Sequence, residues 1–265
     1  MLPAAVRKLS CNPLVRSVAH HLHVTKFARS VYCRLLSSDG DLRVSCLGVE
    51  AVFRAHNNKQ LAFLDYILTT EREAIEAALC HLTEGDTFLD VGSHFGIFSV
   101  LASKLVGPMG SVVAVEPHDG AAQVLRENLA TNRCKNVTVL NVAFTDTSGP
   151  VALVYHENGI GLQPSSNPTA TQHAIQGVAG DEALQNFSIP AAVKIDVEGH
   201  EYAVLTGLRQ TLSNELCRLL SIEIHPTLLP SGIGRDQVKS FIQECGFTIV
   251  RETIRSAETQ VVAAR

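Results

Sequence analysis

The sequence predicts an α/β fold in which a mostly parallel sheet is covered by helices on both faces, and two observations support this. From residue 87 onward, short apolar segments alternate with amphipathic segments of helical period. The apolar segments are nearly continuous, which is typical of strands buried on both faces. The chain has 265 residues, of which 46% are hydrophobic and 18% charged, so it is long enough for one large domain of this kind.

The segment before this alternation predicts a strand or hairpin and then a helix. Residues 42–56 carry short β-rich runs. Residues 69–82 predict a helix, because Thr70 and Glu73 form a capping box in front of an apolar stripe at helical spacing. That stripe consists of Ile75, Ala78, Leu79 and Leu82.

The later elements follow from the same two periods. Strands are predicted where apolar residues run together, and helices where they recur every three or four positions. The predicted strands are 87–92, 111–116, 136–144, 151–156, 173–178, 191–199, 218–225, 247–251 and 259–264. The predicted helices are 95–107, 121–132, 200–212 and 235–246.

The N-terminal segment differs in charge from the rest of the chain. Its first 38 residues hold no Asp or Glu, but carry six Lys or Arg residues among Leu, Val and Ala. We divide the chain into a basic helical extension at 1–40, able to associate with an acidic surface, and a catalytic domain at 41–265. A cleaved organelle-targeting peptide and an unstructured tail remain alternatives for residues 1–40.

Composition narrows the function classes. The net charge of −4 argues against a nucleic-acid-binding protein, which usually has a basic excess. The seven cysteines are scattered without a C-x-x-C pair, which indicates thiols in a reducing compartment, and we predict a cytoplasmic location unless the N-terminus directs the chain to an organelle. No apolar run is long enough to predict a transmembrane helix. The sequence does not predict the oligomeric state.

A glycine turn follows the strand at 87–92 and predicts a ligand site. In an open parallel sheet, ligands bind beyond the carboxyl ends of the strands. Gly92 permits close approach of the backbone, and Gly96 begins a helix whose free N–H groups favour an acceptor or anion. The spacing Asp90-x-Gly92-x-x-x-Gly96 is neither the dinucleotide fingerprint nor a P-loop, which makes a pyrophosphate ligand less favoured.

The next predicted strand ends in Glu116. An acid at this position usually accepts hydrogen bonds from the two hydroxyls of a ribose. A ribose without a pyrophosphate indicates S-adenosylmethionine, which has an adenosine at one end and an amino acid at the other. A tight turn that binds nothing is the alternative.

Four successive motifs resemble the FkbM-type S-adenosylmethionine-dependent methyltransferases. They are GDTFLDVGSHFGIFSVLAS, GSVVAVEPH, NVTVLNVAFTDTSG and VKIDVEGHEYAVLTG, in order over roughly residues 48–226. The resemblance implies the class I methyltransferase (Rossmann-like) fold, whose seven-stranded sheet has an antiparallel last strand, a role that residues 259–264 would fill. Ser93 and His94 replace the Ala-Asn pair that many members have at this point.

The resemblance also implies a cofactor-binding set. Asp90, Gly92 and Gly96 would line the methionine end, with Ser93 and His94 in the same turn. Glu116 would bind the ribose, and the segment from Asn141 to Ala143 would lie along the adenine. Asp196 could orient the amino group of the cofactor or the acceptor.

Polar residues after two later strands are the candidates for chemistry, because methyl transfer to a hydroxyl requires an aligned nucleophile and removal of its proton. Asp196 ends one strand, and Glu223 and His225 lie two apart near the end of another, so these two point to one face. We predict Asp196, His225 and Glu223 as catalytic. With Glu198 they could hold a cation, but no spacing requires it, and we predict no metal.

The predicted function is S-adenosylmethionine-dependent O-methylation. The resemblance implies a hydroxyl of a sugar, a glycan or a natural product as the acceptor, entering under the loop at 157–171. An N- or protein methyltransferase is an alternative, although the N/D-P-P-Y/F motif that lines an acceptor nitrogen is absent. A nicotinamide-dependent oxidoreductase lacks its pyrophosphate loop, and a cofactor-binding protein without turnover is the remaining alternative.

Overall fold

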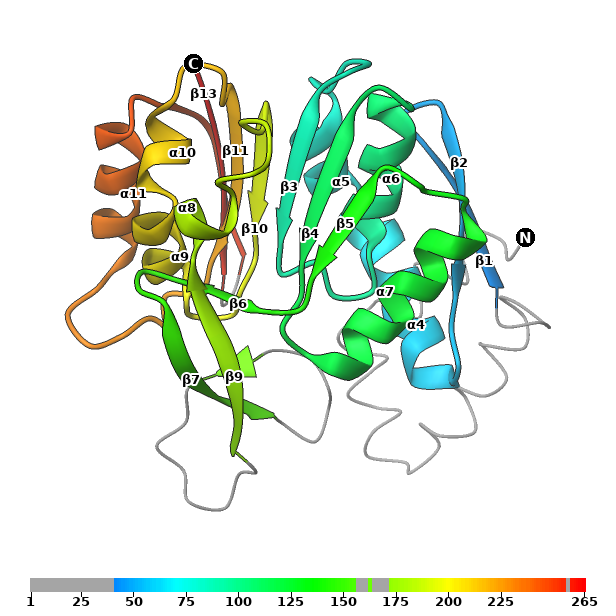
Figure 1. The fold of residues 1–265 in the computed structure, drawn as a ribbon, viewed down its shortest axis with the longest axis horizontal. Coiled ribbons are helices and arrows are strands. Elements are labelled where there is room, and N and C mark those ends of the chain that lie inside the picture. The colour runs from blue at the N-terminus through cyan, green and yellow to red at the C-terminus, as the bar shows by residue number, and fades with distance from the viewer. Residues whose placement is uncertain (1–40, 156–161, 164–171, 256–257) are drawn as a thin grey trace. The chain divides into compact units, whose positions relative to one another are not determined.

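The computed structural model describes residues 41–155, 162–163, 172–255 and 258–265 (Figure 1). The predicted N-terminal extension at 1–40 and nearly all of the loop at 157–171 lie outside the described residues. The chain divides into two compact units, Met1–Glu73 and Ala74–Arg265. No helix in the described part of the chain is both long and apolar enough to cross a membrane.

The first unit holds the predicted hairpin. Strands β1 (Asp41–Cys46) and β2 (Val49–Arg54) pair antiparallel through a two-residue turn. Both turn residues, Leu47 and Gly48, have positive φ, at 50° and 78°, which matches the twist that such hairpins need.

Helix α4 (Asn58–Thr70) follows the hairpin and was not predicted from the sequence. Asn57 caps it by accepting hydrogen bonds from the backbone N–H groups of the next helical turn, at 3.0 Å each. The predicted capping box at Thr70 is wrong, because Thr70 is the last residue of α4 and the next helix, α5 (Arg72–Leu79), begins two residues later. The apolar stripe predicted for that helix is buried.

The second unit contains a seven-stranded sheet in the order β12-β13-β11-β10-β3-β4-β5. Every strand is parallel to the others except β13, which runs antiparallel to both of its neighbours, as the family resemblance implies. In Figure 1, helices α6 and α7 lie on one side of these strands and α9 and α11 on the other. The strands are β3 (Thr87–Val91), β4 (Ser111–Val115), β5 (Val137–Leu140), β10 (Ala192–Ile195), β11 (Leu219–Ile224), β12 (Thr248–Ile254) and β13 (Thr259–Ala264).

The buried side chains of the central strands form the hydrophobic core of this unit. Each residue of β3 and β10 is buried, and so are all but the first residue of β4. Burial on both faces explains why these strands read as continuous apolar runs. The flanking helices are α6 (Ile97–Val106), α7 (Asp119–Thr131), α9 (Glu201–Gly207), α10 (Arg209–Ser213) and α11 (Arg235–Glu244).

Two predicted elements are divided in the structure. The single strand predicted at 136–144 is two strands, β5 and β6 (Ala143–Thr145), because the chain turns at Asn141, whose side chain donates to the backbone oxygens of Glu116 at 2.8 Å and of Pro117 at 3.2 Å. The single helix predicted at 200–212 is α9 followed by α10.

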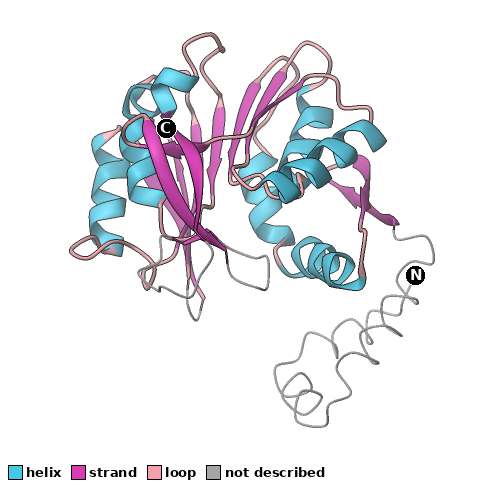
Figure 2. Cartoon of the chain, turned by 60° about the horizontal axis from the view of Figure 1, so that its bottom comes forward, coloured by secondary structure: helices cyan, strands magenta, loops and turns pink. Residues whose placement is uncertain are grey.

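Strand β6 belongs to a second sheet in the order β6-β9-β7-β8. Figure 2 shows the strands of both sheets with the helices around them. The other members are β7 (Gly149–Tyr155), β8 (Leu162–Gln163) and β9 (Gln172–Ala179), and the short helix α8 (Gly180–Ala183) follows β9.

Candidate functional site

The predicted glycine turn begins directly at the end of β3. The backbone N–H groups of Gly92 and Ser93 donate to the Val115 oxygen on β4, at 2.9 and 3.0 Å. Gly92 has a φ of +79°, and a Cβ there would lie 1.8 Å from the backbone oxygen of Asp196. Only glycine fits, and this close packing brings the turn after β3 against the segment after β10.

Gly96 is the N-cap of helix α6 and also adopts a left-handed conformation, with a φ of +82°. A Cβ at this position would lie 2.3 Å from Cδ1 of Leu125 on α7. The turn is closed by Ser93, whose hydroxyl donates to the backbone oxygen of Asp90 at 2.7 Å. The first N–H groups of α6 therefore face the end of β3, where they can bind an acceptor or an anion.

Glu116 follows β4 and is only 4% exposed. Its Oε2 accepts a hydrogen bond from the backbone N–H of His94, and its Oε1 accepts one from the backbone N–H of His118, both at 2.8 Å. Each oxygen keeps a second lone pair, so the carboxylate can still accept one hydrogen bond from each hydroxyl of a vicinal diol. Burial raises the pKa of Glu116 from about 4.5 to about 7, against the opposing effect of these two backbone hydrogen bonds.

Lys194 on β10 lies between the glycine turn after β3 and the segment after β10. Its Nζ donates to the Gly92 oxygen at 2.8 Å and lies 3.6 Å from Oδ1 of Asp90 and 3.6 Å from Oδ2 of Asp196. Burial alone would lower the pKa of Lys194, but the carboxylates of Asp196 and Asp90 outweigh it and raise that pKa. Lys194 is therefore a cation shared by both acids.

Asp90 is completely buried and supports the glycine turn from inside the protein. Its Oδ2 accepts a hydrogen bond from the Ser99 hydroxyl on α6 at 2.6 Å. Its Oδ1 makes no hydrogen bond within the described residues. Burial raises the pKa of this carboxyl, while Lys194 and Ser99 oppose the shift.

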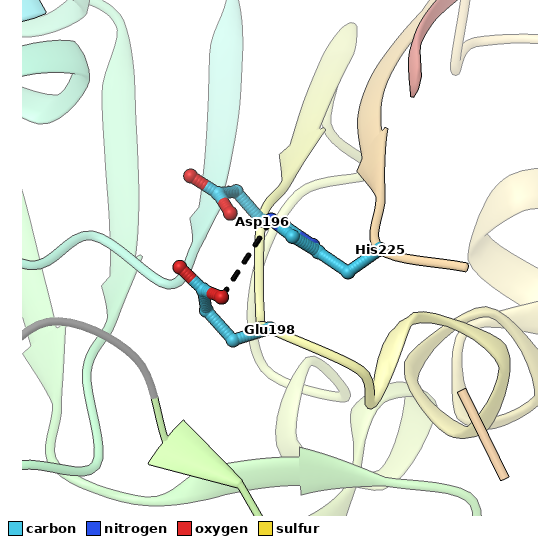
Figure 3. A group of neighbouring side chains, drawn as sticks. All are labelled: Asp196, Glu198 and His225. Carbon is cyan, nitrogen blue, oxygen red and sulfur yellow. Dashed lines mark ion pairs between the residues drawn. The ribbon is translucent and has the colours of Figure 1, made fainter. Parts of the chain in front are cut away.

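A second group of side chains gathers around His225, which follows β11. The Nδ1 atom of His225 lies 2.7 Å from Oε1 of Glu201, and its Nε2 lies 3.6 Å from Oε2 of Glu198 and 3.9 Å from Oε1 of Glu223 (Figure 3 shows the arrangement with Glu198 and Asp196). Burial alone would lower the pKa of His225. The hydrogen bond to Glu201 and the nearby carboxylates outweigh burial and raise that pKa to about 9.

Glu198 is held in an unusual backbone conformation beside this histidine. Its φ is +51°, and the next residue, Gly199, has a φ of +102°. Non-glycine residues in the left-handed region are uncommon and often occur at functional sites. Burial raises the pKa of Glu198, and His225 opposes that shift.

The remaining predicted residues occupy distinct places. His94 has a φ of +47° and stacks its ring on Phe95, with 3.8 Å between the ring centroids. Its backbone N–H, rather than its ring, is the group that contacts Glu116. The side-chain hydrogen bonds of Asn141 hold it beside the end of β4. Ala143 is buried at the start of β6.

The structure also adds residues that the prediction did not assign. Lys194 reads in sequence as one residue of an apolar strand, and only its register against β3 shows that it pairs with Asp90. Glu258 lies 3.9 Å from Nε2 of His225, although it is 33 positions away in the chain (258 − 225). Glu201 is one of the polar residues that follow the strand predicted at 191–199 but received no role from the sequence, and the structure shows that it is completely buried.

These features fit S-adenosylmethionine. Glu116 offers the two acceptor positions that a ribose needs, and its orientation is already fixed by two backbone donors. The N-terminus of α6 can bind the carboxylate at the amino acid end of the cofactor. Asp196, whose side chain is 34% exposed, can accept hydrogen bonds from the amino group at the same end. No part of the turn has the spacing of a pyrophosphate loop.

Comparison with known proteins identifies a family and a relative that this chain resembles. Residues 90–249 match the methyltransferase FkbM domain. The hexuronic acid methyltransferase AglP of Haloferax volcanii is 27% identical over 172 residues, which cover 63% of this chain and 68% of that protein.

Two solved structures are similar to this chain over about three quarters of its length. Precorrin-6y C5,15-methyltransferase of Geobacter metallireducens is 14% identical, with a TM-score of 0.47 over 74% of this chain and 87% of that one. Aeropyrum pernix fibrillarin, solved with bound S-adenosyl-L-methionine, is 15% identical, with a TM-score of 0.47 over 74% of each chain. The family match covers more than half of the sequence, so this chain belongs to the FkbM methyltransferase domain family and uses S-adenosylmethionine as its cofactor.

Proposed function

We propose that this methyltransferase transfers the methyl group to a hydroxyl oxygen of a sugar, with hexuronic acids, free or within a glycan, as the first acceptor class to test. The observation that carries the proposal is the group of carboxylates and one imidazole beyond β10 and β11. Such groups can orient a hydroxyl and take its proton. The name of the Haloferax volcanii relative supports the sugar class.

The proposed roles divide the site at Lys194. On the cofactor side, Gly92, Ser93, His94 and Gly96 form the turn for the amino acid end, and Glu116 binds the ribose. Asn141 and Ala143 lie along the adenine, and Asp90 supports the turn from within. On the acceptor side, Asp196, Glu223 and His225 orient the hydroxyl, and a carboxylate of this group receives its proton.

The direct test offers S-adenosylmethionine with a labelled methyl group and three acceptors, namely a hexuronic acid, the neutral hexose and the amino sugar of the same stereochemistry. We expect an O-methyl ether of the hexuronic acid, identified by mass spectrometry and NMR. Transfer to the nitrogen of the amino sugar, or to protein side chains, would favour an N- or protein methyltransferase. Cofactor binding without transfer to any class of acceptor would favour a binding protein.

The affinity for S-adenosylmethionine should rise about tenfold between pH 6 and pH 8, because only ionised Glu116 can accept all four hydrogen bonds and its pKa is about 7. Lys194 and Asp90 are the charged groups near this carboxylate. The shift also predicts that the free energy of unfolding of the free protein falls as the pH rises from about 4.5 to about 7, since the folded state keeps its proton longer than the unfolded chain.

The control for this prediction is Glu116→Gln, which keeps the shape of the side chain but does not titrate. Calorimetric titration from pH 6 to pH 8 should give a shallower pH slope for the variant, and the difference between the two slopes removes any titration of the cofactor itself. Equal slopes for the two proteins would show that Glu116 does not contact the ribose as an ionised acceptor.

A further inference from the structure

His225 is oriented from behind by a buried acid. The side chain of Glu201 is completely buried, and its Oε1 accepts a hydrogen bond from the Gly199 N–H at 2.9 Å and lies 2.7 Å from Nδ1 of His225. A carboxylate can only accept, so Nδ1 carries a proton, and Nε2 is the ring nitrogen at which a metal ion would replace the second proton of the imidazolium. Histidines that bind metals usually show this arrangement, with a carboxylate behind the ring.

The Nε2 atom of His225 faces a set of carboxylates without bonding to any of them. Its distances are 3.6 Å to Glu198, 3.9 Å to Glu223 and 3.9 Å to Glu258, all too long for hydrogen bonds. The residue is 6% exposed, and its Nε2 is close enough to these carboxylates for ion pairs when the ring is protonated. The ring nitrogen is thus directed at a group of acids.

The spacing of these atoms suits a metal ion. The ligand atoms of Asp196, Glu198 and His225 all lie within 4.8 Å of one another, and those of Glu223, His225 and Glu258 do as well. Two ligands bound about 2.1 Å from one ion lie roughly 3 Å apart at right angles and roughly 4.2 Å apart across it. Small side-chain movements would therefore bring the first set onto one ion (Figure 3).

The charges around Nε2 of His225 also favour a cation at this position. Asp196, Glu198, Glu223 and Glu258 surround this position, and Lys194 is the lysine nearest to Asp196, at 3.6 Å. Lys194 is also shared with Asp90 and hydrogen-bonded to the glycine turn, so it cannot move into this position. Several carboxylates held close together in a partly buried site favour a cation between them, which is either the protonated His225 or a metal ion that replaces its proton.

We propose that Asp196, Glu198 and His225 bind one divalent metal ion, with Glu223 and Glu258 beside it. A mixed set of one imidazole and several carboxylates favours Mn²⁺ or a similar first-row ion over Ca²⁺, which prefers oxygen ligands alone, and over the thiolate-rich sites of structural zinc. The ligands come from the segments after β10 and β11, so the ion would lie at the acceptor edge of the sheet.

The role of this ion rests on the proposed function and makes it more specific. An acceptor hydroxyl bound to the ion becomes more acidic and is held in place. Its proton passes to the carboxylate of Glu223. A lone pair of the oxygen then forms the new bond to the methyl carbon, and the electron pair of the breaking carbon–sulfur bond goes to sulfur, which leaves S-adenosylhomocysteine.

The test uses the full-length chain without a histidine tag, treated with EDTA and dialysed, and titrated with MnCl₂ while the EPR signal of free Mn²⁺ is followed. We expect one bound ion per chain. Glu198→Gln and His225→Gln should each weaken binding at least tenfold, and Glu201→Gln, which touches no ion, should weaken it roughly 10- to 100-fold. The control Glu244→Gln removes a 60% exposed carboxylate on α11 and should bind Mn²⁺ like the unchanged protein.

S-adenosylmethionine binding by each variant shows that it is folded, because the cofactor residues lie outside the set that is changed. No Mn²⁺ binding up to roughly millimolar concentration, or binding that Glu198→Gln and His225→Gln leave unchanged, would overturn the metal site. Methyl transfer is assayed separately. Transfer to hydroxyls without Mn²⁺ binding would overturn the metal site alone, and Mn²⁺ binding without transfer to hydroxyls would overturn the proposed function alone.

Discussion

Replacing Gly92 with alanine should lower the free energy of unfolding by at least about 3 kcal/mol and abolish measurable S-adenosylmethionine binding. The new Cβ would lie 1.8 Å from the backbone oxygen of Asp196, and the residue has a φ of +79°. The clash is with backbone rather than with the end of a flexible side chain, so either the glycine turn or the segment after β10 must move. Thermal unfolding and calorimetric titration with the cofactor measure the two effects.

Gly85→Ala is the matched control for this substitution. Gly85 has a φ of +89°, but a Cβ there would meet nothing within 4 Å. It should therefore show only the cost of a left-handed alanine, about 1 to 2 kcal/mol, with normal cofactor binding. If the two variants unfold at the same temperature and bind S-adenosylmethionine equally well, the contact between the turn and Asp196 does not constrain the site.

Replacing Asp196 with asparagine should lower kcat for methyl transfer to a hydroxyl by roughly 10²- to 10⁴-fold, the usual range for impairing the proton transfer that Asp196 supports beside Glu223. Asparagine keeps the size of the side chain but carries no charge, so it is a weaker ligand for a cation. The affinity for S-adenosylmethionine should stay within about tenfold, because Glu116 and not Asp196 is the proposed ribose ligand. Steady-state kinetics and calorimetric titration separate the two quantities.

The control is Asp236→Asn, which changes a 92% exposed carboxylate in the first turn of α11 and should leave kcat unchanged. If the variant binds the cofactor more weakly but keeps its kcat, Asp196 lies at the amino group of the cofactor instead of at the acceptor. An Asp196→Asn enzyme with full kcat would remove Asp196 from the catalytic group.

The fold was predictable because each element of the sheet carries its own local signal. Continuous apolar strands, the glycine turn and the acid after β4 are all visible within short windows of sequence, and the structure places them as predicted. The sequence did not predict helix α4, and it predicted a single strand at 136–144 where the structure has β5 and β6. Its division depends on the hydrogen bonds from Asn141 to the chain after β4, which no local pattern reveals.

The candidate site was predictable only in part, for the same reason. Glu223 and His225 are neighbours on one strand, and their proximity follows from its period of two. Glu201 and Glu258 reach the same histidine from α9 and from the segment before β13, and neither has a spacing that relates it to His225. Contacts set by sheet order and register are the part that sequence alone did not provide.

The sharing of Lys194 between Asp90 and Asp196 has a consequence for how the two substrates influence each other. One buried ammonium group lies 3.6 Å from a carboxylate behind the glycine turn and 3.6 Å from another at the proposed acceptor edge. A ligand that draws Lys194 toward one acid changes the electrostatic free energy of the other, and thermodynamic linkage makes this coupling equal in both directions. We therefore expect cooperative binding of the methyl donor and the acceptor, and non-additive free-energy effects of substitutions at Asp90 and Asp196.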